Sequence, residues 1–440
     1  MRKLYAVIAA CLLIAGIINP TVTAYAETTD LIQQTQTIDS KASLLVNAQT
    51  GQILHEQNID ESLPVYSITK LMTAYLVLEE IYAENPTLTW ETELKASEKI
   101  SNVSRDLNFS GISLEVDGTY TVRELFEAGL IYSANGPIMV MAEAIGGSEQ
   151  GFVDLMNQKA QEMGLTKTKY VTSTGLAGGD VKIHDIPINE TGENLMSARD
   201  VAILSKELLE KYPEILEVTS IPEKTFDENG EYPELMKSYN WMLPGLVFEY
   251  PGVDGLKTGS AEGAYQAAFV ATAKKDNFRV ISVVIGAQDS STRFTETKKL
   301  LDYAFNDLKN YLIVSPESTI NENNTFAVRK GSAKTVDVKT NDTIIISSTQ
   351  AELTFESYFA PVAEKYYPAV EKFTAPIAEN EILGKVTVDT TGMKFLTEAI
   401  QQDFGADVYA TTAVENNFFL KGAFEDLKDG TIRLFQKWFN

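Results

Sequence analysis

Apolar residues follow two kinds of spacing between about Lys41 and Leu312. In the middle of this segment they recur at steps of three and four, which is typical of amphipathic helices. These helices are predicted at Thr69–Tyr82, Val122–Ile131, Pro137–Ile145, Gly151–Met163, Ala198–Lys211 and Arg293–Leu312. Short apolar runs between turn residues predict strands at Ala42–Val46, Gln52–Leu54, Ala264–Ala273 and Phe278–Ala287. Because the strands come from both ends of the segment, they are expected to share one sheet in an α+β domain.

The character of the chain changes after Ser315-Pro316. Short β-type runs separated by polar turns predict a small all-β domain over residues 315–410. The runs are Thr325–Val328, Thr335–Lys339, Thr343–Ser347, Leu353–Phe355 and Ile382–Val388. They contain no cluster of titratable residues that would form a site.

Helical spacing returns in residues 411–440. Apolar residues recur there among basic ones, at Leu420, Phe424, Leu427, Leu434 and Trp438. An aromatic-rich, partly basic amphipathic helix at a chain terminus predicts an anchor that lies in a membrane surface. A helix docked on its own domain is the alternative.

The first 26 residues have the pattern of a secretory signal peptide. Arg2 and Lys3 precede an apolar stretch, and Ala24-Tyr25-Ala26 forms a small-residue cleavage site. A retained transmembrane helix would need about 18 or more apolar residues and a stop-transfer flank. Export of the chain from Glu27 onward is therefore expected.

The amino-acid composition excludes several kinds of functional site. Cys11, the only cysteine, lies in the signal segment, so disulfides and thiolate sites are excluded from the exported chain. With only His55 and His184, a multi-histidine zinc site is excluded too, and no metal or cofactor is expected. Both histidines are expected to be surface residues or hydrogen-bonded polar residues. The net charge of −24 argues against nucleic acid as a partner.

Ser67-Ile68-Thr69-Lys70 stands where the first predicted helix begins. A serine here is usually an N-cap, but a capping box needs Glu or Gln three residues later, and lysine has no acceptor. Lys70 therefore either extends to water or meets the hydroxyl of Ser67. Positions i and i+3 share one face of a helix, so the amine of Lys70 can reach Ser67 Oγ.

Two further motifs follow along the chain. Ser133-Ala134-Asn135 precedes a predicted helix, and Lys257-Thr258-Gly259 precedes a predicted strand. The S-x-x-K and K-T-G patterns each occur once, whereas S-x-N occurs again at Ser238-Tyr239-Asn240. S-x-x-K alone is a weak signal, since about one match is expected by chance in a chain of this length.

Together and in this order, the three motifs resemble those of the penicillin-recognising serine acyltransferases. Ser67–Thr73 and Val253–Gly259 are similar to the first and third motifs of the D-alanyl-D-alanine carboxypeptidases, low-molecular-mass penicillin-binding proteins of that group. The resemblance implies a β-lactamase/transpeptidase-like catalytic domain, an antiparallel sheet with helices. The layout also fits: signal peptide 1–26, catalytic domain 27–314, small β-rich domain 315–410 and amphipathic anchor helix 411–440.

The residue types themselves predict a serine acyl transfer. Burial beside Lys257 would favour a neutral Lys70, which can take the proton of the nucleophile Ser67. Ser133 is expected to relay the proton towards the leaving amine, and Asn135 to hold the substrate amide.

The substrate side of the site is expected around the third motif. Lys257 would supply positive potential and Thr258 would bind the terminal carboxylate of the substrate. The resemblance places Gly259 and Ser260 beside the substrate, with the backbone N–H groups of Ser67 and Ser260 as the oxyanion hole. Arg293 lies where the family tends to carry a guanidinium for that carboxylate; an arginine on a solvated surface is the alternative.

Two stretches leave the specificity open. Ser260-Ala261 follows the third motif, where many relatives of the resembled family have a threonine at the second position. Gly175–Glu193 is long, polar and glycine-bearing, and is expected to form a loop near the cleft.

These features predict a serine D-Ala-D-Ala carboxypeptidase that removes the terminal D-alanine from peptidoglycan stem peptides through an acyl-enzyme on Ser67. β-Lactam antibiotics such as penicillins are expected to acylate the same hydroxyl. The enzyme is expected on the outer face of the bacterial cytoplasmic membrane, held peripherally by its C-terminal helix. One alternative is a β-lactamase, although the E-x-x-L-N segment common in class A enzymes is not found. The other is a non-catalytic cell-wall-binding protein, which would need no nucleophile.

Overall fold

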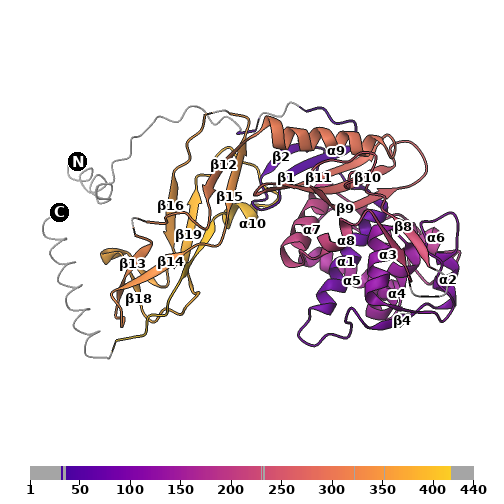
Figure 1. Cartoon of the computed structure of the whole chain (residues 1–440), viewed down its shortest axis with the longest axis horizontal. Coiled ribbons are helices and arrows are strands. Elements are labelled where there is room, and N and C mark those ends of the chain that lie inside the picture. The colour runs from indigo at the N-terminus through magenta and orange to yellow at the C-terminus, as the bar shows by residue number, and fades with distance from the viewer. Residues whose placement is uncertain are drawn as a thin grey trace, which may run out of the picture. The chain divides into compact units, whose positions relative to one another are not determined.

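A five-stranded antiparallel sheet forms the centre of the N-terminal half of the structure. The computed structural model describes residues 31–32, 36–228, 230, 233–321, 323–350 and 352–417. The strand order is β2-β1-β11-β10-β9, so the first and last strands of this half pair side by side (Figure 1). The strands are β2 (Ile53–Gln57), β1 (Ala42–Asn47), β11 (Phe278–Ala287), β10 (Ala267–Lys275) and β9 (Val253–Ser260).

Successive residues of these strands belong alternately to two hydrophobic cores. On β10, Val270 packs into the larger core and Phe269 into the smaller one. This alternation is the period of two that a strand imposes on its side chains. The larger core is shared with α1 (Lys70–Ile81), α3 (Val122–Ile131), α4 (Asn135–Gly146), α5 (Glu149–Glu162) and α7 (Ala198–Lys211). The smaller core is covered by α9 (Thr292–Asp302), and Figure 1 shows α9 and the helix cluster on opposite sides of the sheet.

Three helices of the larger core, α3, α5 and α7, begin at side-chain caps, whereas α1 and α4 do not. Thr121 and Glu124 form a capping box at α3, and Ser148 caps α5 through the backbone N–H of Gly151. In contrast, α1 has no side-chain cap and continues directly from a 3₁₀ turn, Tyr66–Thr69. The start of α1 is therefore positioned by tertiary contacts instead of by a local cap.

Shorter elements complete this half of the chain. The short helices are α2 (Glu98–Ser104), α6 (Gly178–Lys182) and α8 (Ile215–Thr219). The two-stranded pairs are β3 (Leu63–Pro64) with β6 (Leu195–Met196), β4 (Glu93–Lys95) with β5 (Thr119–Thr121), and β7 (Glu223–Phe226) with β8 (Glu234–Lys237).

The C-terminal half is built mainly of strands around a third hydrophobic core. A seven-stranded sheet has the order β16-β19-β20-β14-β13-β18-β17, and β12 pairs with β15. The strands are β12 (Lys309–Val314), β13 (Thr325–Arg329), β14 (Thr335–Lys339), β15 (Ile344–Ser348), β16 (Ser357–Pro361), β17 (Tyr366–Tyr367), β18 (Lys372–Thr374), β19 (Ile382–Val388) and β20 (Ala406–Ala410). A 3₁₀ turn (Pro368–Val370) and a short helix, α10 (Glu398–Gln402), complete it.

The expected α+β class is confirmed, and three details of the prediction are wrong. The closing helix ends at Asp302, passes through a π-helical turn, Tyr303–Asp307, and is followed by β12 instead of reaching Leu312. Leu353–Phe355 is irregular, and the neighbouring strand is β16. The third motif lies inside β9 instead of before a strand.

Two predictions concern residues outside those that the structure describes. They are the signal peptide, residues 1–26, and most of the anchor helix 411–440, since the description stops at residue 417. Within the described part, Val414 forms an isolated β-bridge with Ile377. No helix of the described residues is long and apolar enough to cross a membrane.

The aromatic contact under α9 gives a test of this packing. Phe269 is fully buried and meets Phe294 of α9 edge to face, with ring centroids 5.2 Å apart. Phe269→Ala is expected to lower the free energy of unfolding by about 3–5 kcal/mol because it leaves a cavity. Urea unfolding followed by intrinsic fluorescence measures this loss.

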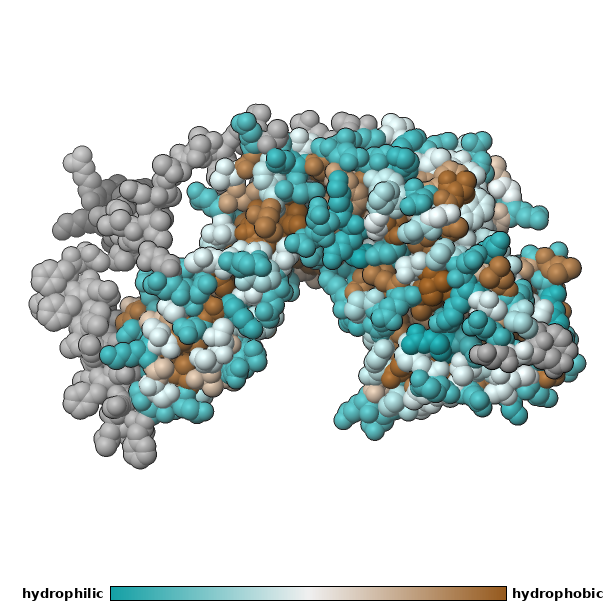
Figure 2. Space-filling model, in the orientation of Figure 1, coloured by the Kyte–Doolittle hydropathy of each residue, from teal (hydrophilic) through white to brown (hydrophobic). Residues whose placement is uncertain are grey.

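The control is an exposed apolar residue, and Figure 2 shows that apolar patches on the face it draws are interspersed with hydrophilic residues. Leu107 is 100% exposed. Leu107→Ala is therefore expected to change the free energy of unfolding by no more than about 0.5 kcal/mol. Equal losses in the two variants would contradict the assigned core.

Candidate active site

Ser67 and Lys70 meet at the junction of the 3₁₀ turn and α1. Lys70 is the first residue of α1, and its Nζ lies 2.9 Å from Ser67 Oγ. Tyr66, just before the serine, has a φ of +51°, which is uncommon outside glycine. Lys70 is fully buried, so it does not extend to water.

The amine of Lys70 has two other oxygen partners. Nζ lies 2.8 Å from Oδ1 of Asn135 and 2.8 Å from the backbone oxygen of Thr174. Burial lowers the pKa of Lys70 well below its ordinary value, and the positive charge of Lys257 lowers it further. Both causes disfavour the ammonium form.

Ser133 and Asn135 lie where α3 passes into α4. Ser133 is buried and has a φ of +60°, and Asn135 is the first residue of α4. Asn135 is fixed by Ser110, whose carbonyl oxygen accepts from both its backbone N–H and its Nδ2, each at 3.0 Å. This arrangement turns Oδ1 of Asn135 towards Lys70, and one hydrogen of Nδ2 remains beyond the bond to Ser110.

The third motif, Lys257-Thr258-Gly259, lies on β9, an edge strand of the five-stranded sheet, and packs against the turn that carries Ser67. Lys257 and Thr258 are buried, whereas Ser260 is exposed. A Cβ on Gly259 would lie 2.4 Å from the carbonyl oxygen of Val65. Glycine is required there because the strand backbone packs against the turn that carries Ser67.

Two cations lie one after the other along this edge. Burial lowers the pKa of Lys257 to about 7, and the charge of Arg293 contributes in the same direction. Arg293 is 3% exposed and donates from Nη1 to the carbonyl oxygen of Gly259 at 3.0 Å, which rules out the alternative of a solvated surface arginine. Its Nε is buried without a hydrogen-bond partner among the residues that the structure describes, and burial lowers its pKa to about 10.

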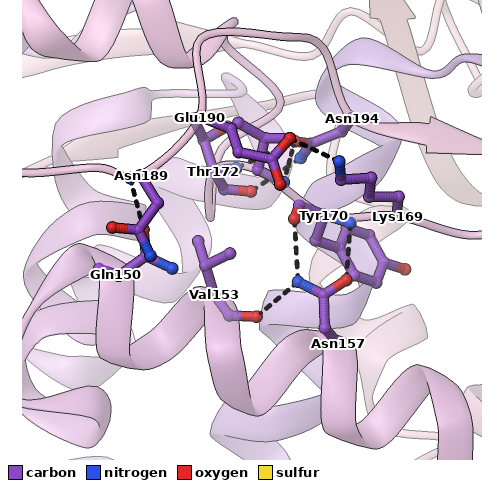
Figure 3. Close-up of polar contacts among 10 residues, drawn as sticks. Gln150, Val153, Asn157, Lys169, Tyr170, Thr172, Asn189, Glu190 and Asn194 are labelled. Atoms are coloured by element: carbon purple, nitrogen blue, oxygen red, sulfur yellow. Dashed lines mark hydrogen bonds and ion pairs between the residues drawn. The ribbon is translucent and has the colours of Figure 1, made fainter.

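The segment 170–176, which sequence reasoning largely missed, supplies the third partner of Lys70. Its first residue, Tyr170, is held by Asn157 of α5, whose side chain donates to the carbonyl of Tyr170 and accepts from its N–H (Figure 3). Oδ1 of Asn194 accepts from the N–H of Thr172, and its Nδ2 donates to Oγ1 of Thr69, next to Lys70. The segment is thereby tied to both α5 and the start of α1.

Gly175 is the part of this segment that the sequence could have revealed. It has a φ of +89°, and a Cβ there would lie 2.0 Å from the carbonyl oxygen of Tyr66. Gly175 and Gly259 therefore both pack against the turn that carries Ser67. The glycine is visible in the sequence, but the carbonyl of Thr174 belongs to the backbone and has no residue-type signature.

The two histidines lie apart from these contacts. His55 is buried in β2, bonded to Ser43 Oγ at 2.9 Å, and burial lowers its pKa to about 4. His184 lies 3.2 Å from a carboxylate oxygen of Asp106. Within the described part of the chain, no group of three or more His, Cys, Asp or Glu residues could hold a metal ion.

Comparison with known proteins identifies the family. The sequence pattern of the family described as D-alanyl-D-alanine carboxypeptidase matches residues 28–289. The chain belongs to this family. It is therefore a serine peptidase that acts as a D-alanyl-D-alanine carboxypeptidase, and the resemblance found in its three motifs is confirmed.

Relatives of this carboxypeptidase cover most of the chain. The D-alanyl-D-alanine carboxypeptidase DacF of Bacillus subtilis (strain 168) is 32% identical over 356 residues, 80% of this chain and 82% of the relative. Among solved structures, a peptidoglycan synthesis regulatory factor (PBP3) from Streptococcus pneumoniae is 30% identical, with a TM-score of 0.72, and the match covers 86% of this chain and 100% of that one.

A third relative was solved with an antibiotic bound. Penicillin-Binding Protein D2 from Listeria monocytogenes, in its ampicillin-bound form, is 30% identical with a TM-score of 0.51, over 62% of this chain and 100% of that one. Membership of the carboxypeptidase family implies a substrate ending in D-Ala-D-Ala. The family is also consistent with the predicted export of the chain.

The close approach of Gly175 to Tyr66 can be tested in the carboxypeptidase. Gly175→Ala is expected to displace the turn that carries Ser67 and to lower D-alanine release about 100-fold, the effect of a misplacement of about 1 Å. The matched control is Gly147→Ala, because Gly147 also has a positive φ, +69°, but nothing lies within 4 Å of its Cβ position. The control is expected to lose about 1–2 kcal/mol of stability and keep its activity. Similar activities for the two variants would contradict the argument.

Proposed function

We propose that Ser67 is the nucleophile of this carboxypeptidase and that Lys70 is its general base. The observation that carries the proposal is the buried Nζ of Lys70, with Ser67 Oγ, Asn135 Oδ1 and the Thr174 carbonyl all within 2.9 Å. A neutral amine has two N–H groups and one lone pair. The amide oxygen and the backbone carbonyl can only accept, so they take both N–H groups. The lone pair then faces the serine hydroxyl, which is the partner with a proton to give.

The reaction follows from this arrangement. Ser67 Oγ attacks the carbonyl carbon of the penultimate D-alanine, and its proton passes to Lys70 Nζ. The backbone N–H groups of Ser67 and Ser260 are proposed to stabilise the oxyanion that forms. When the C–N bond breaks, the proton reaches the leaving amine through Ser133, and D-alanine departs. Water then attacks the ester on Ser67 and gives a proton to Lys70, which passes it to Ser67 Oγ as the acyl C–Oγ bond breaks.

The terminal carboxylate of the substrate is proposed to bind beside the third motif. Arg293 has a buried Nε without a described partner, and Lys257 adds a second cation on the same edge. A carboxylate prefers such charge-assisted donors. Thr258 would add a hydroxyl, Gly259 lets the strand pack closely, and Nδ2 of Asn135 would hold a substrate carbonyl.

The remaining parts of the proposal concern the cell and the layout of the chain. We propose export by the signal peptide 1–26 and a location on the outer face of the cytoplasmic membrane. The spacing of Leu420, Phe424 and Leu427 supports peripheral anchoring through residues 411–440. The proposed catalytic domain is 27–314 and the proposed β-rich domain 315–410. Peptidoglycan stem peptides are the proposed substrate, and β-lactams the proposed covalent inhibitors.

Intact mass spectrometry with benzylpenicillin tests the nucleophile. The wild-type enzyme is expected to gain a lasting adduct that maps to Ser67, because the acyl-enzyme deacylates slowly. Ser67→Ala is expected to gain none and to release no D-alanine. Ser291→Ala is a matched control, since Ser291 makes no side-chain cap at α9. An adduct that persists in Ser67→Ala would refute the assignment, and a transient adduct with rapid consumption of penicillin would indicate a β-lactamase.

The lowered pKa of Lys257 predicts a pH effect on carboxylate binding. With a pKa of about 7, Lys257 is charged below that pH and neutral above it, whereas Arg293 stays charged until about 10. The measurement is kcat/KM for a D-Ala-D-Ala peptide divided by kcat/KM for its C-terminal amide, since this ratio cancels the ionisation of Lys70. The ratio is expected to fall roughly tenfold as the pH rises through neutrality, the worth of one charge-assisted contact.

Lys257→Arg supplies the control for this pH effect. Arginine remains protonated throughout the range, so the fall near neutrality is expected to disappear. A ratio that stays constant with pH in the wild-type enzyme would show that the charge of Lys257 does not hold the carboxylate.

A further inference from the structure

Glu149 is a buried acid that the reaction above does not use. It is the first residue of α5 and is 2% exposed. Its Oε1 accepts from the backbone N–H of Ser173 at 2.7 Å, and its Oε2 accepts from Ser173 Oγ at 2.8 Å. Both oxygens of the carboxylate are thus bound to one residue of the segment 170–176.

Ser173 stands directly before the residue whose carbonyl contacts Lys70. Three successive peptide groups are each fixed by a different partner. Glu149 binds the N–H of Ser173, Oγ1 of Thr73 donates to the carbonyl of Ser173 at 2.6 Å, and Oγ1 of Thr172 accepts from the N–H of Gly175 at 3.1 Å. The last of these peptide groups carries the carbonyl of Thr174, 2.8 Å from Lys70 Nζ. Because peptide groups are planar, these contacts set the direction in which that carbonyl points.

We propose that Glu149 is a positioning residue for the general base: it holds Ser173 so that the Thr174 carbonyl takes one N–H of Lys70. This inference rests on the proposed role of Lys70. If the carbonyl turned away, the neutral amine would have one fixed acceptor, Asn135 Oδ1, and could rotate its lone pair away from Ser67. Glu149 would therefore affect the rate of proton transfer without touching the substrate.

The energetic cost of Glu149 supports a role beyond packing. Burial raises its pKa to about 7, although the hydrogen bonds from Ser173 act in the opposite direction. A buried carboxyl is costly unless hydrogen bonds compensate for lost water. An apolar residue would fill the space without that cost, but it could not bind both polar groups of Ser173.

The neighbouring residue on α5 provides a matched control. Gln150 accepts from the backbone N–H of Asn189 at 2.7 Å, which holds the outer part of the loop after Gly175 (Figure 3). It lies in the same first turn of α5 but makes its contact away from Lys70. Gln150→Ala should therefore loosen the loop without turning the carbonyl of Thr174.

The test measures the first-order rate constant of acylation by benzylpenicillin at saturating concentration, followed by intact mass. This constant is a property of each labelled molecule and does not depend on how much of the enzyme is folded. Glu149→Ala is expected to lower it about tenfold or more through misplacement of the base, with the dissociation constant of the non-covalent complex nearly unchanged. Glu149→Gln is expected to restore it, since the amide can accept from the Ser173 N–H and donate to its Oγ. Gln150→Ala is expected to match the wild-type enzyme.

Ser173→Ala keeps the proposal testable even where Glu149→Ala folds poorly. It removes one of the two contacts of Glu149 and is expected to slow acylation as well. Combined with Glu149→Ala, it should add less than its own effect, because the two residues act through one contact. A normal rate constant in Ser173→Ala, or in Glu149→Ala, would overturn the proposal, as would equal slowing by Gln150→Ala or no recovery in Glu149→Gln. Ser67→Ala, run in parallel, separates the two failures. An adduct in that variant would refute the nucleophile and with it the proposed function on which the role of Glu149 rests. If Ser67→Ala gains no adduct and Glu149→Ala acylates at the normal rate, only the role of Glu149 is refuted.

Discussion

The burial of one lysine amine is the constraint on which the candidate active site depends. Lys70 has no contact with water, and its Nζ receives oxygen partners from the turn before α1, from the start of α4 and from the segment 170–176. These partners come from parts of the chain that are far apart in sequence. An amine in such a position is neutralised more easily than it is charged, and it then has a fixed orientation. Burial thus accounts both for the neutral form that the proposed base, Lys70, needs and for the fixed orientation of its amine.

The layered fold keeps these segments in place. The central sheet supplies β9 at its end, and the larger core fixes α1, α4 and α5 against the same face. Gly175 and Gly259 then allow two backbones to approach the turn of Ser67 more closely than any other residue would permit. Since α1 lacks a side-chain cap, these approaches and the bond from Asn194 to Thr69 replace the local signal that would otherwise set its first residue. The proposed nucleophile, Ser67, is therefore positioned by packing on both sides.

The sequence revealed what depends on periodicity and residue type. The ranges Val122–Ile131, Ala198–Lys211 and Phe278–Ala287 were predicted with the bounds that the structure has, because each has a regular apolar pattern. The contact among Ser67, Lys70 and Asn135 could be anticipated because the side chains of serine, lysine and asparagine carry the polar groups that meet there. By contrast, the carbonyl oxygens of Ser110 and Thr174 act through the backbone, which no residue type reports. The strand β12 was mistaken for helix because an apolar run next to a helix fits both spacings.

The cations of the site form a series in which each one affects the next. Arg293 lowers the pKa of Lys257, and Lys257 lowers the pKa of Lys70. On the proposed roles, an arriving substrate carboxylate opposes both effects and by itself would favour protonation of Lys70. Above neutral pH, however, Lys257 is neutral and can take up a proton as the carboxylate binds, because its pKa then rises. The added positive charge offsets the added negative charge near Lys70. A lysine beside the base, instead of a permanently charged arginine, thus lets the site bind an anion while the base keeps the neutral form that it needs for attack.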